Sequence, residues 1–434
     1  MKEKKLYWIL IFFTVSTFCF AGEIIQMSLK DAVDCVVREN LSLKGEKILL
    51  DEKKLSRDTS WNFLYPEASM SASTSQNHAY INTREKGISS SLSLSGSISW
   101  SLRASDFLNI SQSINNYQIG ILDYDIAKSE IEKNAVLFYY LLQVEREQIE
   151  LQKILLDNSK NRLDSAKRGY RNSEISRIEL LRKEYNYKEN CDKLTSLENS
   201  YQILMIRFKQ LLNLPEDVQI DFMDKLPDIE ELNIDLLKNV NAEKTTSVFK
   251  LKLETEKQQL ANRKNIFQFI PYFSMSFSMG TEAMPTIKNW QDNTNQNISL
   301  KAAVTLPLGN VLPFSTVQTN ILKGKKSIDR LQLATEEEIR NQNTEKIAGL
   351  TGINQLLASC ESHKENCSIT KEAYQLSQRA YQEGELDYQT LSDTESDYQE
   401  ATYNLLYIKY ELMKSILEFG KQFNVSLQQL GVIK

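Results

Sequence analysis

The stretch Ile88 to Leu102 alternates serine with apolar side chains along almost its whole length. Every odd position from Ser89 to Ser101 is serine, and most even positions are apolar. Only a β-strand, whose side chains point alternately to two faces, sorts these residues onto opposite sides. Taken alone, the stretch is typical of an amphipathic strand in a soluble sandwich. Its unusual length and uniformly hydroxylated face also fit a wall between an oily and a wet environment.

The scarcity of helix breakers is the second constraint on the fold. The 434 residues include only 14 glycines and 7 prolines, which favours long uninterrupted elements. Residues 106–171 contain no proline and have heptad-like apolar spacing, so they predict one helix about 90 Å long. Residues 174–213 predict an antiparallel return helix, and such a pair must pack along a coiled-coil-like seam. The net charge of −5 argues against a nucleic-acid partner.

The chain repeats this plan. Pro66 opens PEASMSAS and Pro271 opens PYFSMSFS, and each segment begins a serine-rich hairpin. The helical turns also align at a constant offset: Tyr170, Glu174, Ile175, Leu180, Glu184 and Tyr187 fall opposite Tyr381, Glu385, Leu386, Leu391, Glu395 and Tyr398. An internal duplication requires the same supersecondary unit twice.

The predicted fold class is therefore α+β and mostly α. Each repeat contains a β-hairpin followed by a long helical hairpin, and a polar loop at 76–87 is expected to join the first two strands. The expected β-hairpins are 66–102 and 271–308, and the expected helical hairpins are 106–213 and 314–423. The expected organisation is a signal peptide at 1–21, a first repeat at 22–225 and a second repeat at 226–434.

The N-terminus has the pattern of a secretory signal. A basic start precedes an apolar run from Leu6 to Phe18, and Cys19 to Ala21 offers small residues at the −3 and −1 positions. The run is too short for a good membrane-spanning helix, so export and cleavage near Ala21 are expected. Lipidation of Cys19 is the less favoured alternative, because the preceding Ser16-Thr17-Phe18 matches the lipoprotein pattern poorly.

Four strands in two hairpins cannot close a membrane barrel alone. Unpaired backbone groups in hydrocarbon are costly, and known spanning barrels have at least about eight strands. A chain that spans must therefore oligomerise, with eight strands as a dimer or twelve as a trimer. The serine face would then line water, and the predicted pore-lining residues are Ser91, Ser93, Ser95, Ser97, Ser99, Ser274, Ser276 and Ser278.

The sequence resembles the TolC family of outer-membrane efflux proteins over nearly all of the mature chain. The opening SLKDAVDCVVRENLSL, the turns RGYRNSEISRIELLRKE and RAYQEGELDYQTLSD, and the strand AAVTLPLGN carry this resemblance. It implies a homotrimer with a twelve-stranded barrel in the outer membrane and a helical tunnel in the periplasm. It also implies a passive channel, serving efflux or type I secretion, that docks to a periplasmic adaptor and an inner-membrane transporter.

The resemblance also assigns the tips of the helical hairpins to gating and adaptor contact. The matching residues are Arg168, Gly169, Tyr170, Ser173, Glu174 and Ile175 in the first repeat, and Tyr381, Gly384, Glu385, Leu386 and Asp393 in the second. Tyr381 matches a latching tyrosine and Asp393 a ring of aspartates at the constriction. The sequence departs from the family at Ser173, where glycine is usual, and at Leu386, where the basic partner of the tyrosine is expected.

No enzyme signature stands out, and no cofactor is expected. Cys360, His363 and Cys367 share one helical face, but a fourth ligand from another segment is missing, so a packed cluster is favoured over a metal site. The competing function is an exported periplasmic coiled-coil scaffold or adaptor without a pore. That alternative explains the helices but leaves the apolar strand faces unburied.

Overall fold

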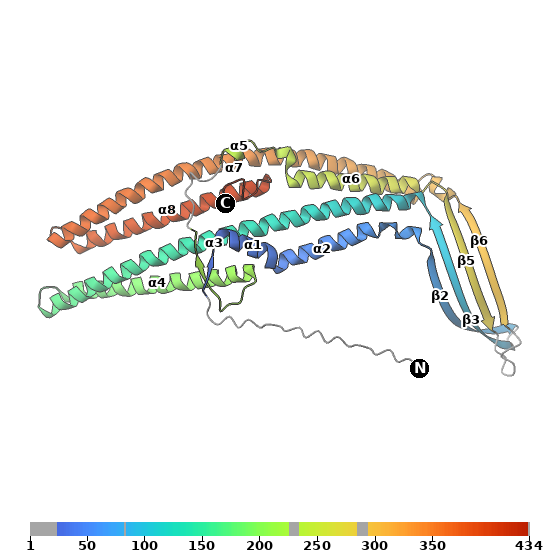
Figure 1. Ribbon diagram of the computed structural model, residues 1–434, viewed down its shortest axis with the longest axis horizontal. Coiled ribbons are helices and arrows are strands. Elements are labelled where there is room, and N and C mark those ends of the chain that lie inside the picture. Colours follow the sequence, from blue (N-terminus) through green and yellow to red (C-terminus); the bar gives the residue numbers. More distant parts are fainter. Residues whose placement is uncertain (1–23, 82–83, 225–233, 284–293, 433–434) are drawn as a thin grey trace, which may run out of the picture.

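The computed structural model describes residues 24–81, 84–224, 234–283 and 294–432. The molecule is elongated and curved, with a sheet at one end and long helices extending from it (Figure 1). The sheet is antiparallel, in the order β2-β3-β5-β6. Its strands are β2 (Glu67–Ile81), β3 (Arg84–Leu102), β5 (Tyr272–Ala283) and β6 (Thr294–Thr305). The two predicted hairpins therefore lie side by side, and β2 and β6 form the edges.

The strands of the first hairpin are longer than the sequence predicted. Residues 76–87 were expected to form a polar loop, but 76–81 belong to β2 and 84–87 to β3. The ladder continues past a register shift between Ala79 and Tyr80. The expected loop was wrong because strands pair through backbone hydrogen bonds, and polar side chains do not prevent these bonds from forming. The expected signal peptide at 1–21 and the repeat boundary at 225/226 lie outside the described residues.

Next to the sheet, four helices lie in the same order as the strands that they extend. They are α2 (Leu41–Asp58), α3 (Ala104–Arg171), α6 (Thr246–Phe267) and α7 (Thr316–Glu383), and neighbours in this order pack on one another. Helices α3 and α7 have 68 residues each, which corresponds to about 100 Å. Gly324 permits a close approach of α7 to Asn262 of α6, where a Cβ would collide.

Away from the sheet, α4 (Arg177–Leu212) returns along α3, and α8 (Tyr388–Gln422) returns along α7. Helices α3 and α8 also contact each other, so this half of the molecule has the order α4-α3-α8-α7 (Figure 1). Both predicted helical hairpins are present, with ends within a few residues of those expected. The predicted mostly helical α+β fold is confirmed.

Between the two halves, short elements wrap the middle of the helices. They are β1 (Ile24–Met27), α1 (Leu29–Glu39), β4 (Gln219–Phe222), α5 (Asp235–Lys238) and the 3-10 turn Ala242–Lys244. Two further 3-10 turns, Ser60–Leu64 and Leu308–Val311, lie where the helices meet the sheet. Strands β1 and β4 pair in parallel. The main core lies here, around the fully buried Tyr139. Its hydroxyl donates to the Met27 carbonyl at 3.0 Å and accepts from the Asp224 amide at 3.2 Å, which fixes this layer to α3.

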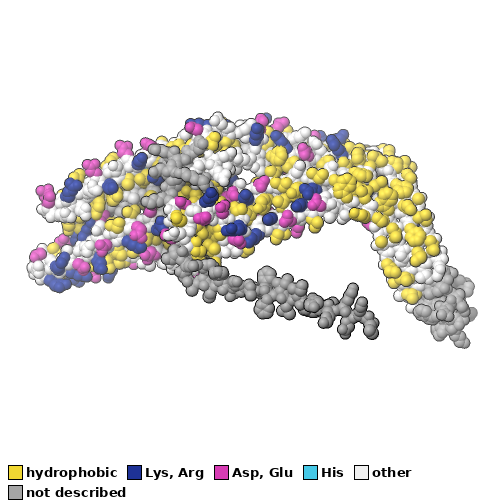
Figure 2. All heavy atoms as spheres, in the orientation of Figure 1, with side chains coloured by type: hydrophobic (Ala, Val, Ile, Leu, Met, Phe, Trp, Pro, Cys, Tyr) yellow, Lys and Arg dark blue, Asp and Glu magenta, His cyan; other side chains and the backbone are white. Residues whose placement is uncertain are grey.

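Exposed apolar side chains cover one face of the sheet and also recur along the helices. Figure 2 shows them covering the visible face of the strands, whereas charged side chains are scattered along the helices. Within the described ranges, the structure contains no helix that is both long and apolar enough to cross a membrane.

Candidate pore face and tip cluster

The structure brings the predicted pore-lining serines together on one face of the sheet. In the β2–β3 ladder, Ser97 lies opposite Ser69 and Ser93 opposite Ser73. Their hydroxyl groups are hydrogen-bonded across the strands at 2.8 and 2.6 Å. The ladder between β3 and β5 continues this face, because Ser97 also lies opposite Ser278. The serines thus form rows that run across the sheet, perpendicular to the strands.

The opposite face of the same strands is apolar and uncovered. Ten of its large side chains are 40 to 78% exposed: Met70, Leu92, Leu94, Ile98, Met275, Phe277, Met279, Ile298, Leu300 and Val304. Burying apolar surface contributes about 25 cal/mol per Å², so leaving a whole sheet face in water is strongly unfavourable. A face of this extent indicates contact with lipid or with another apolar surface.

The two helical tips have nearly identical backbones. At the first tip Ser173 has φ 63°, and at the equivalent position of the second tip Gly384 has φ 78°. In each tip, the backbone amide of the following residue donates to a carbonyl in the last turn of the helix. Glu174 donates to the Gly169 carbonyl, and Glu385 donates to the Ala380 carbonyl. These are the hydrogen bonds of a Schellman motif. The first turn, which has Ser173 in place of glycine, therefore keeps the backbone conformation of its glycine-containing counterpart.

Most of the predicted tip residues are exposed. Arg168, Tyr170, Ser173, Glu174, Gly384, Glu385 and Asp393 are exposed, Ile175, Tyr381 and Leu386 are half-buried, and Gly169 is buried. Asp393 accepts a hydrogen bond from Gln389 at 2.9 Å. The ring of Tyr381 packs edge-on against Tyr388, with 6.3 Å between the ring centroids, and burial raises the pKa of Tyr381. The gating roles of these residues remain predictions.

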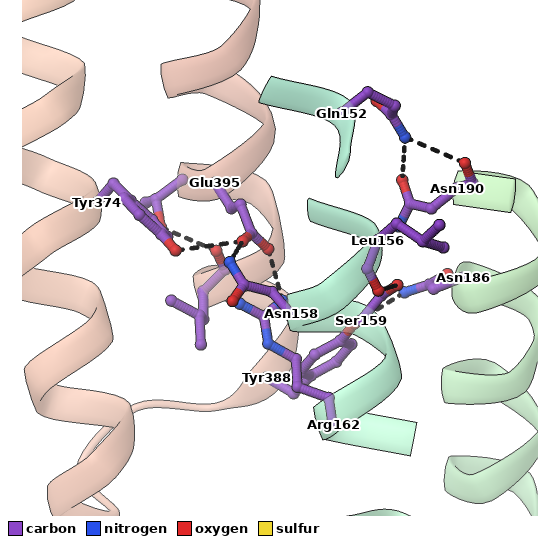
Figure 3. Close-up of polar contacts among 12 residues, drawn as sticks. Gln152, Leu156, Asn158, Ser159, Arg162, Asn186, Asn190, Tyr374, Tyr388 and Glu395 are labelled. Carbon is purple, nitrogen blue, oxygen red and sulfur yellow. Dashed lines mark hydrogen bonds and ion pairs between the residues drawn. The ribbon is translucent and has the colours of Figure 1, made fainter. Parts of the chain in front are cut away.

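A buried polar cluster joins the two helical hairpins near their tips (Figure 3). Arg162 Nη1 of α3 donates to Glu395 Oε2 of α8 at 2.5 Å, and these side chains are only 15 and 10% exposed. Asn158 and Tyr374 donate to the other carboxylate oxygen at 3.1 and 3.2 Å. Burial lowers the pKa of Arg162, but the Glu395 carboxylate outweighs this effect and raises it. The carboxylate thus has partners on both α3 and α7.

Tyr388 extends this cluster from α8 to α4. Its ring lies 5.6 Å from the guanidinium carbon of Arg162, and its hydroxyl accepts from Asn186 at 3.1 Å. The ammonium group of Lys183, on α4, lies over the same ring. Lys183 is 4% exposed, and its nitrogen has no hydrogen-bond acceptor among the residues that the structure describes. Burial, with the charge of Arg162 nearby, lowers the pKa of Lys183 to about 8, although Glu179 opposes the shift.

Comparison with solved structures identifies the fold. The outer-membrane channel OprN aligns with a TM-score of 0.71 at 15% identity, over 92% of this chain and 90% of that one. The Campylobacter jejuni CmeC outer membrane channel aligns with a TM-score of 0.72 at 16% identity, over 92 and 85%. The open state of the Neisseria gonorrhoeae MtrE outer membrane channel aligns with a TM-score of 0.68 at 16% identity, over 92 and 90%.

The chain has the fold of these outer-membrane channels. The predicted TolC-like fold is confirmed at this level. No protein-family model matches the chain, and no curated protein matches its sequence.

Within this channel fold, sequence reasoning missed the buried tip cluster. No sequence pattern points to Arg162 or Lys183, and Glu395 stands out only as the repeat position aligned with Glu184. One sequence signal was available. Glu395 follows the buried Leu391 by one helical turn, so it lies on the face that packs in the seam. A carboxylate at such a position requires a partner, but the sequence does not say which one.

Cys360, His363 and Cys367 do not form a set of metal ligands. Cys360 is buried, and Cys367 lies 3.6 Å from the Thr402 hydroxyl. Within the described parts of the chain, no cluster of three or more His, Cys, Asp or Glu side chains is arranged to hold a metal ion.

Proposed function

We propose that the protein is a homotrimeric channel-tunnel of the outer membrane. It conducts exported substrates passively from a periplasmic adaptor and an inner-membrane pump to the exterior, in efflux or type I secretion. One observation carries the proposal: within the described chain, the sheet has an uncovered apolar face, a serine face and two unpaired edges, β2 and β6. Three copies joined edge to edge would close a twelve-stranded barrel, with lipid outside and hydroxyl groups inside.

The helices next to the sheet support closure through the same edges. The edge helix α2 exposes Leu41, Ile48 and Leu55 at heptad spacing, between 61 and 68%. The other edge helix, α7, exposes Leu333 at 66% and Ile347 at 69%. A heptad stripe is the usual seam of a helix that packs on a second helix. Each edge therefore offers an apolar stripe that lacks a partner in the described chain.

The stripes lie at matching heights along the tunnel. Lys53 of α2 and Lys250 of α6 both donate to Asp123 of α3, at 3.2 and 2.7 Å, so these two residues lie at one level. Helix α6 is then joined to the antiparallel α7 by the contact of Asn262 with Gly324. Because α6 and α7 are antiparallel, Lys250, which precedes Asn262 by twelve residues, lies level with the residue twelve positions after Gly324, near residue 336. This part of α7 is therefore also level with Lys53. This places Leu55 level with Leu333, and by the same count Leu41 level with Ile347.

The far half supplies the gate in this proposal. The tips at Ser173 and Gly384 narrow the tunnel and contact the adaptor, and the buried cluster around Glu395 holds the two helical hairpins together above them. Opening separates the hairpins, a change between two packed arrangements. No chemistry is needed, since the partner pump supplies the energy. The segment 1–21 serves as the export signal, and the repeats 22–225 and 226–434 each contribute one hairpin of each kind.

An inter-copy disulfide tests the assembly. Cys35, Cys191, Cys360 and Cys367 are replaced by alanine, and the test pair Leu55→Cys with Leu333→Cys is added. We expect oxidation of outer membranes to give a covalent trimer that resists heating in detergent and is lost on reduction. A control pair, Leu55→Cys with Leu322→Cys, is mismatched in height by about three helical turns and should not cross-link. A water-soluble monomer would instead favour the periplasmic scaffold.

A further inference from the structure

Two charges lie in a single row of the sheet, at its two edges. Glu67 of β2 is opposite Ser99, Ser99 is opposite Ser276, and Ser276 is opposite Lys301 of β6. Of the side chains that the structure describes in these four strands, Glu67 and Lys301 are the only charged ones, and both are exposed. The row runs along the serine face. Lys301 therefore shares the face proposed to line the pore, and its neighbours Leu300 and Ala302 share the apolar face.

We propose that Lys301 forms a ring of three cations inside the barrel that favours the passage of anionic solutes. The inference rests on the proposed function, because the ring exists only if three sheets close around a water-filled lumen. Threefold symmetry then places the three ammonium groups at one height. Rings of charged side chains set the ion preference of a pore through direct electrostatics. The substrate class favoured at this level is a solute that carries a negative charge.

The geometry of closure keeps this lysine away from the glutamate at the other edge. Strands of membrane barrels lie about 4.8 Å apart and tilt by about 40° from the barrel axis. Because of this tilt, a row followed across the four strands of one copy meets the next copy about 16 Å further along the strand than the equivalent row of that copy. Lys301 of one copy and Glu67 of the next therefore lie too far apart to pair, although they share a row within each sheet. The lysine lies among hydroxyl groups, and Glu67 forms a separate ring where β2 begins, at the helical end of the barrel.

A cysteine beside the lysine can report the local potential. In the protein with alanine at its four other mature cysteines, Ser276→Cys places a thiol directly opposite Lys301. The probes are an anionic and a cationic methanethiosulfonate reagent, applied to trimers in membranes. The ratio of their reaction rates measures the electrostatic preference at this point. A change in the pKa of the thiol alters both reaction rates by the same factor, so it does not change their ratio.

We expect the anionic reagent to be favoured, and Lys301→Gln to lower the rate ratio by about threefold at 0.1 M salt. The effect should shrink at 1 M, where the Debye length falls to about 3 Å. The double substitution Lys301→Ser with Ser99→Lys moves the lysine to the other side of the thiol, because Ser99 is the second row neighbour of residue 276. This variant should restore the rate ratio. Lys326→Gln, on α7, is the control that removes a lysine outside the sheet.

The outcomes separate the two proposals. If the thiol introduced at position 276 reacts with both reagents but the rate ratio is the same with and without Lys301, the cation ring is wrong and the channel stands. If that thiol reacts with neither reagent in the intact trimer, the serine face does not line water, and the proposed function and this inference fail together.

Discussion

Arg162 of α3 and Glu395 of α8 form a buried ion pair that joins the two helical hairpins of the chain, with 2.5 Å between nitrogen and oxygen. The residues come from different repeats and are 233 positions apart in sequence. Breaking a buried pair by removing one partner leaves an uncompensated charge, which typically costs about 3–5 kcal/mol. The tip of the protein is therefore held by a contact whose loss should be easy to measure.

Glu395→Gln tests this contact. The amide keeps the shape of the side chain but leaves the Arg162 guanidinium without its counter-charge, so the packed tip should lose about 3 kcal/mol and the channel should open more often. Thermal unfolding and single-channel open probability measure the two effects. The matched control is Glu189→Gln, which removes an exposed partner of Lys193 on α4 and should change stability by less than about 1 kcal/mol. If the two variants have the same unfolding temperature and the same open probability, the buried pair does not hold the tip closed.

Lys183→Met removes a buried charge that opposes tip packing. The pKa of Lys183 is about 8 in the packed tip and 10.5 in its ordinary state, so between these values the separated state binds more protons. The packed tip of the native protein should therefore gain stability as the pH rises from about 8 to about 10.5. Lys183→Met should be more stable at pH 7, by about 1–3 kcal/mol, and should lack this pH dependence.

Unfolding midpoints between pH 7 and 10.5 check this prediction. Lys188→Met, at a site where the side chain is 72% exposed, is the control and should retain the native pH profile. A native pH profile in Lys183→Met would contradict the prediction, because it would mean that Lys183 does not set the pH dependence of the packed tip.

Ser173 and Gly384 offer a matched pair at the two tips. Both have a left-handed backbone, which is strained for serine and free for glycine. Ser173→Gly should stabilise the protein by about 0.5–1 kcal/mol, and Gly384→Ser should destabilise it by about 1 kcal/mol. A Cβ at Gly384 meets no atom within 4 Å, so the second effect is conformational. Chemical denaturation measures both, and effects of the same sign would contradict the assigned turn geometry.

Asp393→Asn tests the proposed carboxylate ring at the constriction. Three carboxylates around a narrow aperture favour cations and bind multivalent ones. The variant, which removes only the charge, should show weaker cation selectivity and weaker block by multivalent cations in planar bilayers. Unchanged selectivity and block would remove Asp393 from the gate.

The strands were predictable from the sequence because alternation is a local signal. Ile88 to Leu102 lies wholly within β3, and the repeat led directly to its partner hairpin. The polar continuation of that hairpin through residues 76–87 was missed, since its pairing depends on backbone groups and not on side-chain pattern. The long helices were predictable for the same local reason, namely the absence of proline over many turns.

The tip cluster was not predictable in the same way. Glu395 meets Arg162 and Asn158 only because α3 and α8 cross there, and neither spacing nor composition records that contact. The row that joins Glu67 to Lys301 likewise depends on three strand registers. Residues far apart in the chain are brought together by tertiary packing, and a single sequence carries no direct signal of it.

Conductance of the purified protein in a planar lipid bilayer tests the central claim most directly. The account predicts discrete, energy-independent current steps from the folded trimer, and larger or longer openings from the Glu395→Gln variant. A folded protein that inserts into the bilayer as a trimer but passes no current, in either form, would contradict the channel.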